Sequence, residues 1–410
     1  MTATHALVAN HAAQWTALLQ RLVRCPSTFE HEHSAVALVE EEIARIGLSP
    51  ITVAFDAAAL KQLPGSQPPY SAVANRRNVV ARLPGRSGGR SLILNSHLDV
   101  VPAGADAEWT HPPFSGAIVD NVMYGRGSFD DKAGAAICLA LLQLLSGERE
   151  RLRGDIVAHF VLEDETTGNG SLLCLEAGHV GDAAIIVDGT RGTSGINQHA
   201  GNIRFGVNVA GRPASVSVSH MGINAAEMLA RLLLDLRQAV FDLNAGNAAP
   251  WTVFPSPNQL STIALDCREA ALTVPAQASA VCYATFTPPT NLAGFRALIE
   301  TVGSEFARRH QLPQQPTFEW DSFAAEPVAS ASAALERTIQ SAAAKVDRQV
   351  SFGPSTGTSD LRHFARHGIP CVLFGPGVGY NPHRADEHVQ LDSLWQTVRI
   401  LFHTINQWCA

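Results

Sequence analysis

Acidic residues and histidines that follow apolar runs mark the chemistry this chain can do. His97 and Asp99 end the run SLILNSHLD, residues 163–165 (Glu-Asp-Glu) end DIVAHFVLEDE, and Asp188 ends AAIIVD. The apolar runs predict buried strands, and α/β sheets place their sites at the carboxyl ends of such strands. Imidazoles and carboxylates are ligands of borderline divalent ions. The pattern therefore indicates a metal centre or an acid–base site, because three adjacent acids repel one another unless cations neutralise them.

Two further segments supply residues of the same kinds. Asp130 and Asp131 follow the turn GRGSF and precede an apolar helix, so they either cap that helix or bridge two cations. A histidine, His383, follows the Gly- and Pro-rich segment FGPGVGYNP. Two imidazoles and three carboxylates, one of them bridging, suit two divalent ions with open positions for water. These five residues are His97, Asp130, Glu165, Asp188 and His383, and binding of a single ion is the alternative.

Helices and buried strands alternate along the parts of the chain that carry these residues. Helical periodicity covers HAAQWTALLQRLV, SAVALVEEEIARIGL and KAGAAICLALLQLLSG, and strand-like segments lie between them. We therefore expect an α/β catalytic domain with a mostly parallel sheet covered by helices on both faces. From about residue 199, strands of alternating polarity surround two helices, which predicts an inserted α+β domain. The expected boundaries are 1–198 and 323–410 for the catalytic domain and 199–322 for the insertion.

Composition restricts the class of protein. The chain has 410 residues, of which 46% are hydrophobic and 16% charged, and its formal net charge is −7. It has no basic run, which argues against a nucleic-acid partner, and no apolar run long enough to span a membrane. Seven cysteines without a C-x-x-C pair favour reduced thiols. We expect a cytoplasmic protein that acts on a small-molecule substrate.

The order and spacing of the motifs resemble those of a known hydrolase family. HLDVVPAG, YGRGSFDDKAG, LEDETTGNGS, GTSDLRHF and HRADE follow one another over nearly the whole chain. They are similar to the motifs of the dinuclear metallopeptidases and amidohydrolases that include aminoacylase-1, acetylornithine deacetylase, succinyl-diaminopimelate desuccinylase and bacterial glutamate carboxypeptidase. The resemblance implies a metal-dependent hydrolase of carbon–nitrogen bonds, with a homodimer formed through the inserted domain. The implied cofactors are one or two divalent metal ions, namely zinc, manganese or cobalt.

The resemblance also divides the five ligands between two ions. It implies that His97, Asp130 and Asp188 bind one ion. It implies that Asp130, Glu165 and His383 bind the other, so that Asp130 is shared.

The same resemblance assigns roles to residues around the metal ligands. The family's general base is the first of two adjacent glutamates, and Asp164, one methylene shorter, occupies that position. Glu163 is the alternative base, although strand alternation points it to the opposite face. Asp99 matches an acid that orients the His97 region. Two more acids, Asp360 and Glu387, match positions near the site.

Several positions depart from the family's pattern. Ser215 stands where relatives have a histidine that helps to hold the substrate's oxyanion, and His220 either supplies that imidazole from a shifted place or is an ordinary loop residue. Phe286 replaces the arginine of the relatives' Asp-x-Arg, so Arg268 and Arg362 are alternative anchors for a substrate carboxylate. The candidate substrate-binding residues are Ser215, His220, Asn224, Arg268, Arg362 and Gly357.

These departures favour amide hydrolysis on an unusual substrate, where the family's usual substrate is an N-acyl amino acid or a small peptide. Two other interpretations remain open. The same metal chemistry can act on a non-peptide carbon–nitrogen bond, for example to deaminate an activated aromatic amine. Alternatively, the chain is an inactive binding homologue, which the altered base favours and the retention of all five ligand types opposes.

Overall fold

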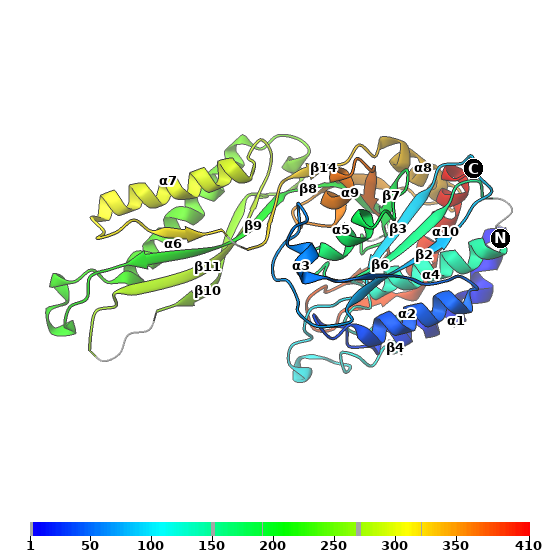
Figure 1. Cartoon of the computed structure of the whole chain (residues 1–410), viewed down its shortest axis with the longest axis horizontal. Coiled ribbons are helices and arrows are strands. Elements are labelled where there is room, and N and C mark those ends of the chain that lie inside the picture. Colours follow the sequence, from blue (N-terminus) through cyan, green and yellow to red (C-terminus); the bar gives the residue numbers. More distant parts are fainter. Residues whose placement is uncertain (1–2, 149–151, 191, 268–271, 321) are drawn as a thin grey trace. The chain divides into compact units, whose positions relative to one another are not determined.

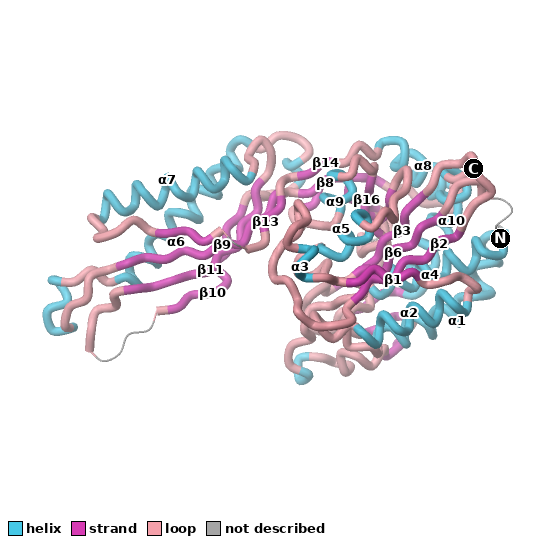
Figure 2. Tube along the Cα trace, viewed as in Figure 1, coloured by secondary structure: helices cyan, strands magenta, loops and turns pink. Residues whose placement is uncertain are grey.

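The computed structural model describes residues 3–148, 152–190, 192–267, 272–320 and 322–410 (Figures 1 and 2). The chain divides into two compact units. The first comprises residues 1–198, 329–353 and 359–410, and the second comprises residues 199–328 and 354–358. The chain thus returns to the first unit at residue 329, where the sequence suggested 323, and the short segment 354–358 belongs with the insertion.

The main sheet, counted over the described residues, has nine strands in the order β1-β2-β6-β3-β7-β16-β8-β14, with β15 beside β8. Its centre is parallel, because β3 pairs in parallel with β6 and β7, and β7 with β16. The strands β1, β2 and β8 are antiparallel to their neighbours. The strands are β1 (Ile51–Ala54), β2 (Arg77–Leu83), β3 (Leu92–His97), β6 (Ile156–Val161), β7 (Ala184–Ile186), β8 (Ser194–His199), β14 (Val328–Ala329), β15 (Ser351–Ser355) and β16 (Cys371–Leu373).

Helices cover both faces of this sheet (Figure 1). On one face, five helices share a single hydrophobic core with the strands. These helices are α1 (Ala3–Val23), α2 (His33–Arg45), α4 (Lys132–Gly147), α8 (Ala333–Ala344) and α10 (Leu391–Trp408). The other face is covered by α5 (Asn169–Glu176), which contacts β2 and β6, and by α9 (Leu361–Arg366), which contacts β16. Every residue of β3 and β6 is buried, as their apolar sequences predict.

A small antiparallel sheet joins two distant parts of the first unit. Its order is β17-β18-β5-β4, with β4 (Ala117–Val119), β5 (Val122–Tyr124), β17 (Gly379–Tyr380) and β18 (His388–Gln390). The segment after β5 carries Asp130, and the segment between β17 and β18 carries His383. Pairing of β18 with β5 therefore fixes the bases of two loops that bear candidate ligands.

The second unit is an antiparallel sheet with helices and its own hydrophobic core. The strands are β9 (Gly201–Ala210), β10 (Gln259–Asp266), β11 (Gln277–Phe286), β12 (Thr317–Glu319) and β13 (Ala324–Ala325), and the long helices are α6 (Ala225–Asp242) and α7 (Leu292–His310). The short helices among the described residues are α3 (Ala57–Leu60), η1 (Asp106–Glu108), η3 (Val216–Met221), η4 (Leu243–Gly246) and η5 (Trp251–Val253). The expected α/β fold with an inserted α+β domain is confirmed. Over the described ranges, no helix combines the length and apolarity needed to cross a membrane.

Candidate metal centre

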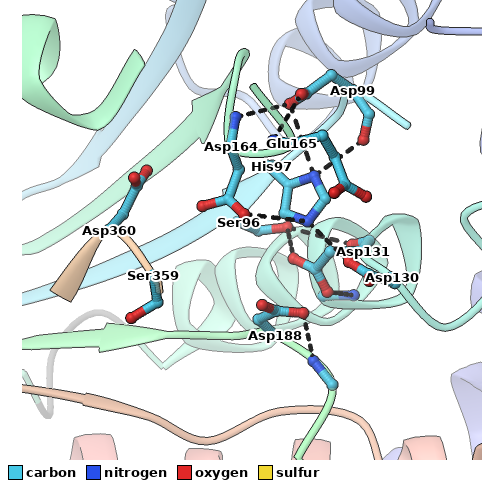
Figure 3. A network of polar contacts seen from close by, with 12 residues as sticks. Ser96, His97, Asp99, Asp130, Asp131, Asp164, Glu165, Asp188, Ser359 and Asp360 are labelled. Atoms are coloured by element: carbon cyan, nitrogen blue, oxygen red, sulfur yellow. Dashed lines mark hydrogen bonds and ion pairs between the residues drawn. The ribbon is translucent and has the colours of Figure 1, made fainter. Parts of the chain in front are cut away.

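Three neighbouring parallel strands bring their carboxyl ends together at the centre of the first unit. His97 is the last residue of β3, Asp164 and Glu165 follow β6, and Asp188 follows β7 (Figure 3). Because strands that run in parallel end at the same edge, residues far apart in the sequence become neighbours there. The structure thus places four of the predicted side chains around one point.

Asp130 lies between the two predicted histidine ligands. One of its carboxylate oxygens, Oδ1, is 3.0 Å from His97 Nε2, and the other, Oδ2, is 3.4 Å from His383 Nε2. His383 Nε2 also lies 2.9 Å from Glu165 Oε2. One carboxylate with an imidazole on each oxygen has the arrangement expected of a ligand shared by two ions.

His97 presents one ring nitrogen to the site and uses the other for support. Its Nδ1 is 2.9 Å from the backbone carbonyl oxygen of Asp99, which leaves Nε2 facing Asp130. The carboxylate of Asp99, whose Oδ1 lies 3.6 Å from His97 Nδ1, also accepts hydrogen bonds from the backbone N–H groups of Asp164, at 3.3 Å, and Glu165, at 3.1 Å. Asp99 therefore supports the His97 ring, mainly through its carbonyl group, and holds the loop after β6 through its side chain.

Two groups of side chains in the described residues are close enough to hold a metal ion. In each group the potential ligand atoms lie within 4.8 Å of one another, and the groups are His97, Asp130 and Glu165, and His97, Asp131 and Asp188. Asp131 was expected only as a capping or bridging residue. Its carboxylate accepts hydrogen bonds from Ser96 Oγ at 2.7 Å and from the backbone N–H of Gly134 at 3.1 Å, so it caps α4 as well. The adjacent Asp-Asp pair was the sequence signal for it.

The electrostatics of the site favour cations. Burial, together with neighbouring carboxylates, raises the pKa of Asp164 to about 7 and that of Asp188 to about 6. Hydrogen bonds to Asp130 and Glu165 raise the pKa of His383 to about 10. Burial lowers the pKa of His97, but the hydrogen bond to Asp130 and the nearby carboxylates outweigh burial and raise it well above its ordinary value. These raised pKa values favour bound protons on the cluster, and bound cations would displace such protons.

Glu387 fixes the loop that carries Asp130. Its carboxylate is fully buried and accepts hydrogen bonds from the backbone N–H groups of Phe129, at 3.0 Å, and Asp130, at 3.1 Å. Arg126 Nη1 donates to the same carboxylate at 2.5 Å. Because Glu387 lies on the chain just after His383, this contact joins the loops of two candidate ligands.

Glu163 points away from this cluster. Its carboxylate is 1% exposed and lies 2.5 Å from Arg76 Nη1, in the interior beside β2. Periodicity in the sequence gave no sign of Arg76, whose only local signal is the pair Arg76-Arg77 before an apolar strand. Of the two candidate bases, Asp164 faces the candidate metal ligands, with Oδ2 4.0 Å from His97 Nε2.

The remaining candidates in the first unit lie beside the site. Asp360 is buried, and burial together with the charge of Asp164 raises its pKa to about 8 (Figure 3). Arg362 is anchored to the backbone, since Nη2 donates to the Thr167 carbonyl at 2.7 Å and Nη1 to the Ser359 carbonyl at 3.3 Å. These contacts fix the guanidinium group of Arg362, one of the two predicted anchors for a substrate carboxylate.

The other substrate candidates belong to the second unit. Ser215, just before the short helix η3, and His220, on that helix, are both exposed, and Gly357 is exposed in the segment 354–358. Asn224 caps α6, because its side chain accepts hydrogen bonds from the backbone N–H groups of residues 226 and 227. Arg268 lies outside the described residues.

Comparisons with known proteins agree on one family. Residues 93–407 match the model of peptidase family M20/M25/M40. Succinyl-diaminopimelate desuccinylase of Methylorubrum extorquens is 30% identical over 394 residues, which are 92% of this chain and 94% of that protein. The M20 family metallo-carboxypeptidase Sso-CP2 of Sulfolobus solfataricus has a TM-score of 0.72 at 13% identity, covering 100% of this chain and 99% of the other. The YXEP protein of Bacillus subtilis, a dinuclear metal-binding peptidase of the M20 family, has a TM-score of 0.69 at 16% identity, covering 97% and 98%.

Proposed function

Because the chain belongs to peptidase family M20/M25/M40 and is a metal-dependent hydrolase of carbon–nitrogen bonds, we propose that it hydrolyses the amide bond of an N-acyl amino acid or a small peptide. The observation that carries this proposal is the position of Asp130, which faces an imidazole with each of its oxygens. The name of the related desuccinylase indicates a substrate that carries a succinyl group. Similarity to that protein therefore favours an N-acyl amino acid as the substrate.

Two divalent ions fit the residues around Asp130. We assign His97, Asp130 and Asp188 to one ion and Asp130, Glu165 and His383 to the other, with zinc, manganese or cobalt suited to this mixture of nitrogen and oxygen donors. Asp131 is close enough to the first group to assist it. Bound ions of this kind polarise the scissile carbonyl group and make water more acidic.

Asp164 is the proposed general base. Its carboxylate lies next to His97 Nε2, and its backbone is held by the Asp99 carboxylate, so its position is defined by the ends of two strands. In this role Asp164 takes a proton from the attacking water and then delivers it to the leaving nitrogen. Glu163 is less suited to this role because its carboxylate is already engaged by Arg76, Thr167 and Asn169.

The experiment that tests this function measures amine release from a panel of N-acyl amino acids and dipeptides. The protein is first stripped with a chelator and then reloaded with Zn²⁺, Mn²⁺ or Co²⁺. We expect turnover on at least one amide with at least one of these ions. Stoichiometric metal binding without turnover on any amide would favour the alternative that the chain is an inactive binding homologue. Release of ammonia from an aromatic amine would show that the enzyme is a deaminase and not an amide hydrolase.

We also infer that two copies of the chain associate through the inserted unit. The strand β10 is an edge strand, and Ile263 and Leu265 on it are 53% and 58% exposed. On the helix α6, Leu234 and Phe241 are 65% and 53% exposed. An edge strand and a helix that both expose large apolar side chains form a surface suited to a second copy.

All seven cysteines are free thiols, which fits the proposed cytoplasmic location.

A further inference from the structure

The turn that carries Asp164 and Glu165 begins with an unusual backbone conformation. Glu163, the residue before them, has a φ of 71°, in the left-handed region that non-glycine residues seldom adopt. Its carbonyl oxygen accepts hydrogen bonds from the backbone N–H groups of Thr166, Thr167 and Gly168, at 3.2, 2.9 and 2.6 Å. A conformation of this kind persists only where surrounding contacts hold it.

The side chain of Glu163 supplies such contacts. Arg76 Nη1 lies 2.5 Å from Oε1, while Thr167 Oγ1 and Asn169 Nδ2 donate to Oε2 at 2.6 and 3.2 Å. Both carboxylate oxygens are therefore used, and the side chain is 1% exposed. Of these three donors, Arg76 is the only one that comes from outside the turn and the helix that follows it.

Arg76 is itself fixed from several sides. Its side chain is 3% exposed, and it forms a two-point contact with Glu32, through Nη2 to Oε1 at 2.6 Å and Nε to Oε2 at 3.2 Å. The centre of its guanidinium group lies 4.8 Å from the ring centroid of Phe29 and 4.9 Å from that of Phe55. A planar cation placed near two aromatic rings and hydrogen-bonded in its plane has little freedom to move.

We propose that Arg76 is a positioning residue for the metal centre, which acts through Glu163. On one side, the Asp99 carboxylate holds the backbone N–H groups of Asp164 and Glu165. On the other side, Arg76 holds the residue just before them. With both contacts in place, the Asp164 and Glu165 carboxylates keep their orientation toward His97 and His383. For the role of Asp164 in catalysis, this inference rests on the proposed function. For metal binding through Glu165, it does not depend on that function.

The test compares changes within one network of buried charges. Glu163→Gln and Glu32→Gln each remove one negatively charged partner of Arg76 with little change in side-chain shape. Of the two, only Glu163 directly precedes Asp164 and Glu165 in the chain. Metal content and affinity are measured by calorimetry and elemental analysis, and kcat and KM are measured on whichever amide is hydrolysed. We expect Glu163→Gln to weaken one of the two ions and to lower kcat, each by about 10- to 100-fold, as is usual when an outer partner of a ligand is lost. Glu32→Gln should alter both by less than about threefold.

Arg76→Met and Arg76→Lys extend the test, with Arg77→Met as the matched control. Arg77 is the next residue and pairs with Glu40 through Nε and Nη2, at 2.8 and 2.7 Å, well away from Glu163. We expect Arg76→Met to reproduce the loss seen with Glu163→Gln, and Arg76→Lys to recover part of it because the charge remains while the planar fork is lost. Arg77→Met should keep wild-type metal affinity. If Arg76→Met fails to fold, the two glutamine variants decide the question.

Two results would overturn the inference. One is equal metal affinity in Glu163→Gln and the wild type. The other is an equal loss of metal affinity in Glu32→Gln and Glu163→Gln, which would show that the network stabilises the fold and does not position the metal ligands. Absence of turnover in all variants and in the wild type, together with a weakened ion in Glu163→Gln, would reject the proposed function and leave this inference standing.

Discussion

Two sets of carboxylates lie near the same end of the main sheet, and they differ in burial and in what neutralises them. Glu163 and Glu387 each contact a buried guanidinium group, from Arg76 and Arg126 respectively. Among the described residues, no lysine or arginine forms an ion pair with Asp130, Asp164 or Asp188. Burying a charge without a partner is costly. The protein itself neutralises the first set with guanidinium groups, whereas the partners of Asp130 and Asp164 are imidazoles, which are themselves candidate metal ligands or lie beside them. The comparison separates the residues that support the site from those that we propose to bind metal or to act on water.

The largest expected effect comes from removing the shared ligand. Asp130→Ala takes one carboxylate from both proposed ions, so we expect turnover to be abolished and the metal content to fall below two ions per chain. Elemental analysis of the purified variant and an amide hydrolysis assay measure the two quantities. Two ions bound at wild-type affinity would show that Asp130 does not belong to the metal-binding set.

The next effect concerns the proposed base. Asp164→Asn removes a proton acceptor and keeps the size of the side chain, so we expect kcat to fall by about 10²- to 10⁴-fold while both ions stay bound. Asp164→Glu tests whether the shorter acid is needed, and we expect it to retain part of the activity. A kcat of Asp164→Asn close to that of the wild type would contradict this role and favour Glu163 as the general base.

A smaller effect is expected at Glu387, one of the two carboxylates that a buried guanidinium group neutralises. Glu387→Gln keeps one acceptor for the N–H groups of Phe129 and Asp130 but loses the charge that pairs with Arg126. We expect metal affinity to fall by about 10- to 100-fold without loss of either ion at saturating metal. Calorimetric titration of the metal-free variant provides the measurement, and an affinity equal to that of the wild type would contradict the supporting role.

The metal-free protein should lose stability as the pH rises from about 4 to 7. Asp164 and Asp188 have pKa values raised to about 7 and about 6, so the folded state keeps protons that the unfolded state has already released. This contribution is complete below the ordinary pKa of a carboxyl group and is lost as the pH rises through the raised values. Thermal unfolding across this range should show a falling midpoint of about 2 °C or more. Saturating metal should reduce the slope, and an equal slope with and without metal would contradict this account.

The smallest effect on the metal centre is expected from the inserted unit. Ile263→Lys combined with Leu265→Lys places charge on the edge strand β10, and we expect a dimer to become a monomer in light scattering. Metal content should stay unchanged, because these residues belong to the other unit. A wild-type protein that is monomeric at micromolar concentration would remove the proposed interface.

Local patterns predicted the strands and their acidic ends because burial and periodicity act over neighbouring residues. The buried runs of β3 and β6 could be recognised from their composition alone, and so could the positions of His97 at the end of β3 and of Glu165 after β6. No such pattern links Arg76 to Glu163, which lies 87 positions further along the chain, or Glu387 to Asp130, 257 positions before it. These contacts depend on how strands and loops assemble.

The sequence by itself determined the types of residue at the strand ends and therefore the kind of chemistry open to this protein. Only the tertiary structure decided how those residues are used. It directs Glu163 to Arg76 and Asp164 to His97, although the two acids are adjacent in the chain. It also places one oxygen of Asp130 near each of two histidines. The physical reason is that the cost of burying a carboxylate depends on the charges around it, and those charges come together only when distant segments pack.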